Sequence, residues 1–359
     1  MNTEKKIRVG ISIGDLNGIG SEVILKTFSD SRMFDFCTPV VFASHKLMRF
    51  YKQQIEISTQ IQIVQTLDKL HPKKLNVTSV WKEDVSVEWG KETQSSGHYA
   101  LKSFQEAVKA LKHNKIDVLI TAPMQKSNIQ TETFSFPGHT DYLNQELEGN
   151  ALMLMVSENL RVGLLTDHIP VKDVSNQITS AGVTQKVKTI YQALKQDFAI
   201  QKPKIAVLSI NPHAGDKGVI GTEDDTLLKP TLETLQAQGI LCYGPFSADS
   251  FFGGKKHLAY DAVLAAYHDQ GLIPFKTLAF GKGVNYTAGL SKVRTSPDHG
   301  TAFDIAGQNK ADPNSFKEAV FEAIKIFKTR TEYLELTKNP LKPHDKNPVY
   351  KKQTRRSHN

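Results

Sequence analysis

Three histidines lie just beyond short apolar runs of the sequence. His168, His213 and His268 each come within three residues of the end of such a run, and a Gly or Pro follows each of them closely. If the runs are parallel strands, their carboxyl ends share one sheet edge, where ligands bind. Three neutral imidazoles without a thiolate suit Zn²⁺, Co²⁺, Ni²⁺ or Mn²⁺ and leave coordination positions open, which is typical of a catalytic site. Asp167 and Asp269 could orient the rings, add a ligand or cap a turn. Taken singly, each histidine also has a purely structural interpretation.

Cationic and amide side chains follow the third histidine in the sequence. They are Lys276, Lys282, Asn285 and Arg294, the last of which precedes a Pro-Asp-His-Gly turn. The planar guanidinium of Arg matches phosphate or carboxylate, and Lys supplies a mobile point charge. Upstream, Thr140 is predicted to be the N-cap of a helix whose free N–H groups could bind an anion. As a set, these residues predict a small anionic, phosphorylated substrate.

Two glycine-containing segments resemble phosphate-binding loops in composition. The segment Gly14–Gly20 follows the first apolar run, but its spacing fits neither the dinucleotide fingerprint nor the Walker pattern, so we interpret it as a tight strand-to-helix turn. The segment 298–307 is more informative, because glycine permits close backbone approach to a ligand and His299 could stack on a base. The second segment is therefore a candidate cofactor site, with a structural turn as the alternative.

Short apolar runs alternate with longer amphipathic segments along most of the chain. Strands are predicted at Arg8–Ile13, Pro39–Ala43, Ile61–Val64, Asp117–Thr121, Leu152–Val156, Val162–Thr166, Ile205–Ile210 and Ala262–Tyr267, with a further strand-like run at Val284–Leu290. Helices are predicted where apolar residues recur about every 3.6 positions, at Gly97–Lys112, Thr184–Phe198 and Asp224–Gln238. This alternation favours an α/β protein with a mostly parallel sheet covered on both faces.

Length and composition exclude several classes of protein. A chain of 359 residues is of ordinary length for two domains. No apolar run approaches the roughly 18–20 residues needed to cross a bilayer, and no export signal is recognisable. Cys37 and Cys242 are too few for a disulfide framework or a thiolate metal cage, so we expect a cytoplasmic protein.

The net charge of +8 is concentrated at the C-terminus. Residues 338–359 hold seven Lys or Arg against one Asp and so supply six of the eight net charges. This segment is rich in Pro and Asn and nearly free of apolar residues, which predicts a flexible, solvated basic tail. The sequence contains neither an RRM-type aromatic signature nor a zinc-finger spacing, so no nucleic-acid partner is predicted.

Eight segments, in order, resemble the motifs of the 4-hydroxythreonine-4-phosphate dehydrogenase family of pyridoxal phosphate biosynthesis. They are GDLNGIGSE, TAPMQK, GHTDYL, TDHIP, NPHAGDKGVIGTED, GPFSADSFF, YHDQGLIPFK and GVNYTAGLSKVRTSPDHGTAFDIAG, between about Val9 and Phe327. HGTAFDIAG is also similar to the cofactor loop of isocitrate and isopropylmalate dehydrogenases, whose fold the family shares. The chain departs from the family pattern at Leu16-Asn17, where Pro-Ala is frequent, at Ser21, where Pro is frequent, and at Asp141, where Glu is common.

The resemblance implies a function for each candidate residue. It implies a single divalent metal, such as Zn²⁺, Co²⁺, Mg²⁺ or Mn²⁺, at His168, His213 and His268. It implies substrate contacts from His139, Thr140, Lys276, Asn285 and Arg294. NAD or NADP would lie along His299–Gly307, with contacts from His299, Gly300, Thr301 and Ala302. Acid–base catalysis would fall to Lys276, Asp249 or Asp269.

The resemblance also implies the domain organisation and the assembly. Two α/β/α domains of the isocitrate and isopropylmalate dehydrogenase type would enclose the active-site cleft. The first would combine residues 1–131 with 296–337, the second would comprise 132–295, and 338–359 would form the tail. The active site would lie at a homodimer interface, with metal ligands from both subunits.

The implied reaction oxidises 4-phosphohydroxy-L-threonine with NAD and then decarboxylates the product to 3-amino-2-oxopropyl phosphate. A bound metal would lower the pKa of the alcohol and stabilise the enolate formed on decarboxylation. One alternative is a paralogous dehydrogenase of a four-carbon sugar-acid phosphate, such as threonate or erythronate 4-phosphate. Others are a phosphate acyltransferase, which needs neither NAD nor the three histidines, and a phosphometabolite sensor whose tail contacts nucleic acid.

Overall fold

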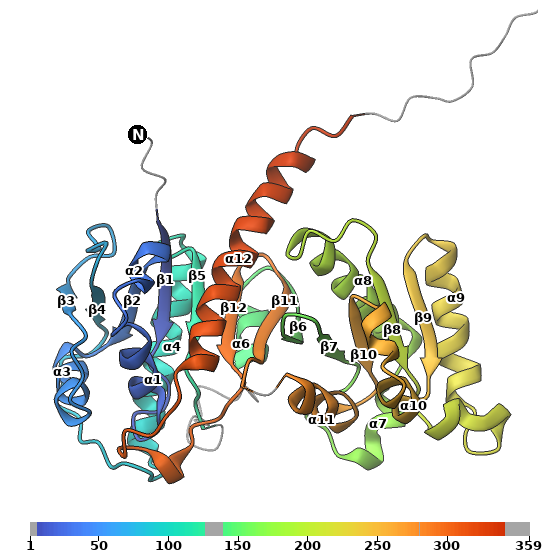
Figure 1. Ribbon diagram of the computed structural model, residues 1–359, viewed down its shortest axis with the longest axis horizontal. Coiled ribbons are helices and arrows are strands. Elements are labelled where there is room, and N and C mark those ends of the chain that lie inside the picture. The colour runs from blue at the N-terminus through green and yellow to red at the C-terminus, as the bar shows by residue number, and fades with distance from the viewer. Residues whose placement is uncertain (1–5, 126–138, 280, 342–359) are drawn as a thin grey trace, which may run out of the picture.

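The strands of the chain form one twelve-stranded sheet. A computed structural model describes residues 6–125, 139–279 and 281–341. The strands are β1 (Ile7–Ser12), β2 (Cys37–Ala43), β3 (Ile61–Val64), β4 (Leu75–Ser79), β5 (Val118–Thr121), β6 (Gly149–Val156), β7 (Arg161–Leu164), β8 (Lys204–Leu208), β9 (Leu241–Phe246), β10 (Ala262–Ala265), β11 (Val284–Leu290) and β12 (Val293–Pro297). Their order across the sheet is β3-β4-β2-β1-β5-β12-β11-β6-β7-β10-β8-β9 (Figure 1).

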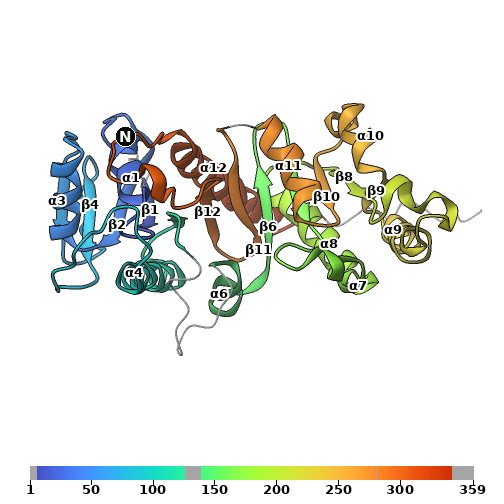
Figure 2. The same ribbon diagram turned by 90° about the horizontal axis from the view of Figure 1, so that it is seen from below.

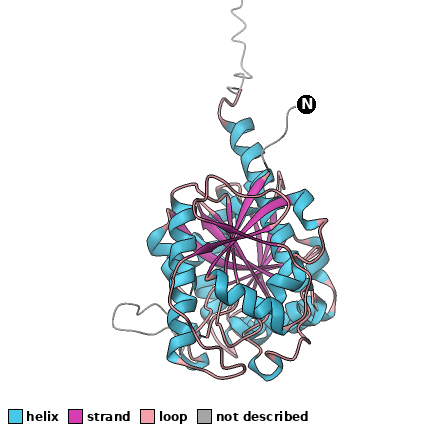
Figure 3. Cartoon of the chain, turned by 90° about the vertical axis from the view of Figure 1, so that its left-hand side faces the viewer, coloured by secondary structure: helices cyan, strands magenta, loops and turns pink. Residues whose placement is uncertain are grey.

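Helices cover both sides of this sheet, which twists along the long axis of the molecule (Figures 2 and 3). They are α1 (Gly20–Thr27), α2 (Met33–Phe36), α3 (His45–Gln54), α4 (Gln94–Lys112), α6 (His139–Glu146), α7 (Val174–Gln177), α8 (Ser180–Gln196), α9 (Lys229–Ala237), α10 (Ala248–Gly253), α11 (His268–Leu278) and α12 (Asn314–Thr337). Shorter 3-10 or π turns lie at Val171–Asp173, Pro212–Gly218, Asp224–Leu228, Lys256–Ala259 and Phe303–Ile305. None of the helices in the described ranges is long and apolar enough to span a membrane.

Local sequence explains where the long helices begin. The side chain of Thr93 accepts a hydrogen bond from Ser96 N at the start of α4, and that of Thr179 accepts one from Gly182 N at the start of α8. Such side-chain caps satisfy N–H groups that have no partner inside the helix. Both helices therefore begin three or four residues before the apolar periodicity that predicted them.

The sheet is mostly parallel, as predicted, with eight parallel and three antiparallel pairings among the described strands. The outer strands on both sides pair in parallel, but β11 is antiparallel to β12 and β6, and β6 is antiparallel to β7. The carboxyl ends of β7, β10 and β8 point to one edge of the sheet, and those of β5 and β12 point to the opposite edge, because three antiparallel pairings intervene between β12 and β7. The α/β class is confirmed, and every predicted strand exists with ends shifted by a few residues.

The longest helix, α12, connects the two halves of the sheet. It packs on β12, β5 and β11 and also reaches α1 and α8, and Figure 1 shows it crossing the middle of the molecule. Its buried Arg330 donates to Asp197 Oδ1 at 2.6 Å from Nε and to the Tyr286 hydroxyl at 2.6 Å from Nη2. Tyr286 in turn donates to Asp197 Oδ2 at 2.6 Å. This buried, fully hydrogen-bonded ion pair fixes β11, α8 and α12 relative to one another.

The predicted domain boundaries remain predictions. One, at residues 131 and 132, lies outside the described residues, and the other, at 295 and 296, falls within β12. The predicted basic tail begins just after α12, and residues 342–359 of it also lie outside the described residues.

Candidate active site

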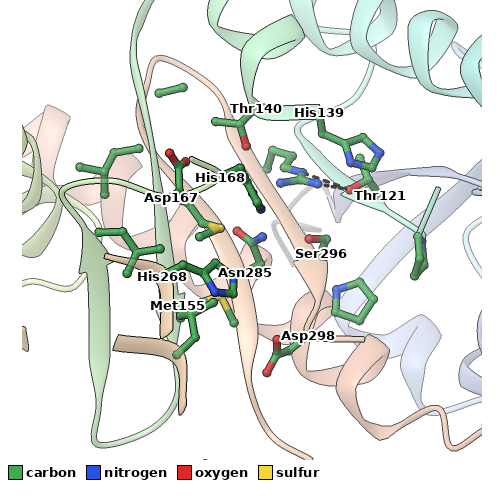
Figure 4. Close-up of a pocket in the computed structure, with 18 of the residues that line it drawn as sticks. Thr121, His139, Thr140, Met155, Asp167, His168, His268, Asn285, Ser296 and Asp298 are labelled. Carbon is green, nitrogen blue, oxygen red and sulfur yellow. Dashed lines mark hydrogen bonds between the residues drawn. The ribbon is translucent and has the colours of Figure 1, made fainter. Parts of the chain in front are cut away.

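A polar cavity of about 550 Å³ lies over the middle of the sheet, where the two halves meet. Residues from β5, α6, β6, β11 and β12 line one part of it, and residues that follow β7 and β10 line the other. Figure 4 shows Asp167, His168 and His268 on one side of this cavity and Thr121 and His139 on the other, with Asn285 and Ser296 between them. Strands distant in sequence therefore bring most of the predicted site residues together, as expected for ligand binding at strand ends.

Arg294 lines this cavity although its side chain is almost completely buried, at 2% exposure. Its guanidinium donates to the hydroxyls of Thr121 and Thr287, both also buried, and no ion pair to a carboxylate is formed within the described chain. Burial without a counter-charge lowers the pKa of Arg294 to about 9. A buried cation of this kind is costly unless an anion compensates it, so the cavity is suited to a ligand with a negative group.

Two further polar atoms at the cavity are buried and have no hydrogen-bond partner among the described residues. They are Asn285 Oδ1 and His299 Nε2. Burial also lowers the pKa of His299. Buried polar atoms are normally hydrogen-bonded, and exceptions at a cavity indicate a missing ligand or water. Asn285 was predicted as a substrate contact and His299 as a cofactor contact, and each is placed where it could bind one.

His168 and His268 lie next to each other at the cavity, as the strand-end prediction requires. They follow the adjacent parallel strands β7 and β10, and their ring centroids are 5.7 Å apart. Asp269 lies outside the cavity lining and pairs with His268 Nδ1 at 2.7 Å. A carboxylate on one imidazole nitrogen orients the ring and leaves the other nitrogen available for a metal. These two histidines therefore suit a divalent metal.

His213 is not part of this group. It follows β8, which is the neighbour of β10, but its side chain is exposed and does not line the cavity. Among the described residues, no set of three His, Cys, Asp or Glu side chains is arranged to hold a metal ion. One chain alone thus brings two of the three predicted ligands together.

The turn that carries His213 has an unusual backbone. Residues His213–Lys217 all have positive φ, between 43° and 79°. Such conformations are strained for residues other than glycine and persist only when their surroundings enforce them. The buried carboxylate of Asp224 provides one restraint, because it accepts hydrogen bonds from Ile210 N, Asn211 N and Asn211 Nδ2 at 2.8, 2.9 and 3.1 Å.

Asp249, a predicted acid–base residue, lies near this turn and not at the cavity. It is exposed on α10, and a hydrogen bond from Ser247 Oγ lowers its pKa, with a smaller contribution from the charge of His213. The structure therefore separates Asp249 and His213 from the other candidates.

The remaining substrate candidates are at the cavity. Lys276 of α11 lines it and forms an ion pair with Asp298 at 3.2 Å. Burial raises the pKa of Asp298, while the charge of Lys276 opposes that shift. His139 and Thr140 line the cavity from the first turn of α6. Since α6 begins at His139, the prediction of Thr140 as an N-cap is wrong.

The segment Gly14–Gly20 is a strand-to-helix turn, as predicted, and it also holds the proposed cofactor loop. Ile19 N donates to Thr301 O at 3.0 Å, and a Cβ at Gly18 would lie 2.8 Å from that same oxygen. The buried Asn17 side chain donates to Lys91 O at 2.8 Å and accepts from Glu88 N at 2.8 Å. The departure from the family pattern at Asn17 therefore has a structural role.

The proposed cofactor loop is open at its start and packed at its end. A side chain at Gly300 would meet no atom within 4 Å, whereas one at Gly307 would lie 2.7 Å from the Trp89 ring. Gly300 lines the cavity, while Thr301 and Ala302 lie beside it and do not. Open backbone next to the buried, unpaired His299 nitrogen is compatible with a bound dinucleotide.

Sequence reasoning missed several residues of the site. Thr121, Ser296 and Asp298 line the cavity from the ends of β5 and β12. Lys186 lines it from α8, a helix predicted only for its apolar face. The end of β5 was predicted from the sequence, but the strand β12 was not, and nothing in the sequence shows that a lysine in the middle of a helix reaches this cavity.

Comparisons with known proteins identify relatives of the whole chain. The family model described as Pyridoxal phosphate biosynthetic protein PdxA matches residues 35–323. A 4-hydroxythreonine-4-phosphate dehydrogenase of Bacteroides thetaiotaomicron is 44% identical over 341 residues, covering 94% of each chain. The crystal structure of the Klebsiella pneumoniae enzyme of the same name has a TM-score of 0.77 at 30% identity, covering 91% of this chain and 99% of that one. A terephthalate 1,2-cis-dihydrodiol dehydrogenase of Burkholderia xenovorans is more distant, with a TM-score of 0.60 at 25% identity, covering 89% and 98%.

Proposed function

The chain belongs to the PdxA family of pyridoxal phosphate biosynthetic proteins, and we propose that it is a 4-hydroxythreonine-4-phosphate dehydrogenase. It would oxidise 4-phosphohydroxy-L-threonine with NAD or NADP and release CO₂ and 3-amino-2-oxopropyl phosphate. The extent of the match supports this proposal, because relatives with that name cover nearly the whole described chain.

One observation carries the proposal at the level of the site. The buried guanidinium of Arg294 has hydroxyl partners but no carboxylate partner, and it faces a cavity that also holds the unpaired Asn285 Oδ1. A phosphorylated substrate supplies the missing negative charge and hydroxyl donors. Arg294 would bind the phosphate from within the sheet, while Thr140 and His139 would contact it from α6.

The chain's own residues would orient the reacting carbons. Asn285 lies between the two walls in Figure 4 and would accept a hydrogen bond from a substrate hydroxyl or ammonium group. Lys276, held by Asp298, is the cavity residue best placed to exchange a proton with the substrate. Asp269 would act by holding the His268 ring, since its own carboxylate lies outside the cavity lining.

A divalent metal would be held at His168 and His268, with His213 completing the set. When bound, it would supply positive charge that favours ionisation of the alcohol and stabilises an enolate. The incomplete donor set of one chain supports a homodimer in which both subunits contribute ligands. Exposed Ile273 and Leu278, on the helix that His268 begins, offer apolar surface for such an interface.

The cofactor would lie along His299–Gly307, with the nicotinamide at the cavity. The loop contributes His299 and Gly300 to the cavity lining, and Gly14–Gly20 supports it from behind. The two-domain division, with the cavity between the domains, and a cytoplasmic location complete the proposal.

A substrate comparison tests the proposal. We expect NADH and CO₂ to form in equal amounts from 4-phosphohydroxy-L-threonine, and much less NADH to form from threonate or erythronate 4-phosphate, which lack the amine. Faster oxidation of a sugar-acid phosphate would instead identify the paralogous dehydrogenase. Acyl transfer to phosphate without any NAD reduction would contradict a dehydrogenase altogether.

A further inference from the structure

We propose that Lys186 binds the carboxylate of the substrate, at the opposite end of the cavity from Arg294. This inference rests on the proposed function, because it assigns one group of the proposed substrate to one residue. Lys186 lies in the second turn of α8 and is partly buried at the cavity wall.

The ammonium group of Lys186 is held in place by backbone carbonyls. Its Nζ donates to Leu164 O at 3.0 Å and to Leu165 O at 2.9 Å. These carbonyls lie at the end of β7, and only Thr166 separates them from Asp167 and His168. A lysine ammonium has three N–H donors, and the third has no acceptor among the described residues. The two carbonyls thus fix the direction of a donor that remains available to a ligand.

The charge of Lys186 is also not neutralised by a direct ion pair. Asp167 is near enough to raise its pKa, against the larger lowering caused by burial, but no carboxylate lies within 4.0 Å of Nζ in the described chain. The other lysine of the cavity, Lys276, is paired with Asp298. Lys186 and Arg294 are therefore the two cavity cations without a carboxylate partner.

The spacing of these two cations matches a substrate that is anionic at both ends. Arg294 lies on β12 and the amine of Lys186 at the end of β7, three strands apart in the sheet. Three strand spacings amount to about 14 Å. An extended four-carbon acid phosphate spans about 8 Å between its terminal oxygens by ordinary bond lengths, and one hydrogen bond of about 3 Å at each end gives a similar total. With phosphate at Arg294, the carboxylate reaches Lys186.

This contact belongs to the bound substrate and not to the reaction that follows. The carboxylate leaves as neutral CO₂, so its ion pair with Lys186 is lost as the C–C bond breaks. An interaction stronger in the ground state than in the transition state lowers KM without raising kcat. Lys186 is thus a specificity and positioning residue, and its replacement should raise KM for 4-phosphohydroxy-L-threonine without lowering kcat.

Two unreactive ligands isolate the carboxylate contact. O-phospho-L-homoserine is the proposed substrate without its oxidisable hydroxyl, and 3-aminopropyl phosphate is the same molecule without the carboxylate. We would measure their Kd by calorimetry on the full chain with NAD and Mg²⁺ present, for the wild type and for Lys186→Met, Lys186→Arg and Lys188→Met. Lys188 is an exposed lysine of the same helix that does not line the cavity, so it serves as the matched control.

Lys186→Met should raise the Kd of phosphohomoserine about 10- to 100-fold, the size expected for one charged hydrogen bond. It should raise the Kd of aminopropyl phosphate less than about threefold. Lys186→Arg should recover part of the loss, and Lys188→Met should change neither Kd. An equal rise in both Kd values for Lys186→Met, or no rise in either, would overturn the inference and leave Lys186 as a cap for the β7 carbonyls. A wild type that binds neither ligand would contradict the proposed function itself, whereas failure confined to Lys186 would not.

Discussion

Replacing Arg294 with methionine should separate the binding role of this residue from its effect on stability. Burial lowers the guanidinium pKa from 12.5 to about 9, which corresponds to about 5 kcal/mol of free energy lost by the charged form. Methionine removes that cost but leaves the Thr121 and Thr287 hydroxyls without their donor, at about 1–3 kcal/mol each. The two effects nearly cancel, so the free energy of unfolding should change by no more than about 2 kcal/mol.

The effect on substrate binding should be much larger than the effect on stability. Loss of a charged hydrogen bond to phosphate, about 2–3 kcal/mol, raises KM about 30- to 150-fold. Urea unfolding and NADH-coupled kinetics measure the two quantities on one preparation. Arg161→Met is a matched control, because Arg161 is partly buried and stacks on Phe198 at 4.5 Å from the ring centroid, away from the cavity. An Arg294→Met protein destabilised by more than about 3 kcal/mol with an unchanged KM would refute the assignment and make Arg294 a structural residue.

Three further substitutions test how the site is supported. Asp224→Asn should turn an amide N–H₂ toward backbone N–H donors and so lower the free energy of unfolding by about 1–3 kcal/mol. It should also speed hydrogen exchange of residues 212–218, and unchanged exchange would show that Asp224 does not hold the left-handed turn. Arg330→Met should lower the free energy of unfolding, measured with urea, by about 3–5 kcal/mol, because it leaves Asp197 buried and without its ion-pair partner. A decrease of less than about 1 kcal/mol would contradict the role given to this ion pair. Gly307→Ala should raise KM for NAD several-fold with little change in KM for substrate, since its methyl group would collide with Trp89 and shift the loop; equal effects on both would place the cofactor elsewhere.

The sequence predicted most of the strands that carry the site, but not β12, which holds Arg294. Apolar runs predicted β7, β8 and β10 because central strands are buried on both faces and read as continuous hydrophobic segments. The pairing of His168 with His268 follows from the same pattern, since adjacent parallel strands end together. The strands β4, with Asn76 and Thr78 among its residues, β9, with Gly244 and Pro245, and β12, with Arg294 and Thr295, lack such continuous runs and were missed.

What the sequence could not predict depends on tertiary context. The three antiparallel pairings of the central strands could not be recognised, because a strand buried on both faces has the same apolar pattern in either direction. His213 satisfied the strand-end rule, but the five-residue left-handed turn directs it away from the cavity. Lys186 lies on an ordinary amphipathic helix, and only the position of α8 against β7 brings its amine to the cavity.

The most direct test of the proposed chemistry is the rate of NADH formation from 4-phosphohydroxy-L-threonine before chelation, after exhaustive treatment with EDTA, and after a divalent cation is returned. We predict loss of at least 90% of the rate on chelation, as an order-of-magnitude expectation for a metal-assisted step, and its recovery with Zn²⁺, Co²⁺, Mg²⁺ or Mn²⁺. A full rate that persists after chelation, or no NADH from this substrate under any of the three conditions, would contradict a metal-dependent dehydrogenase.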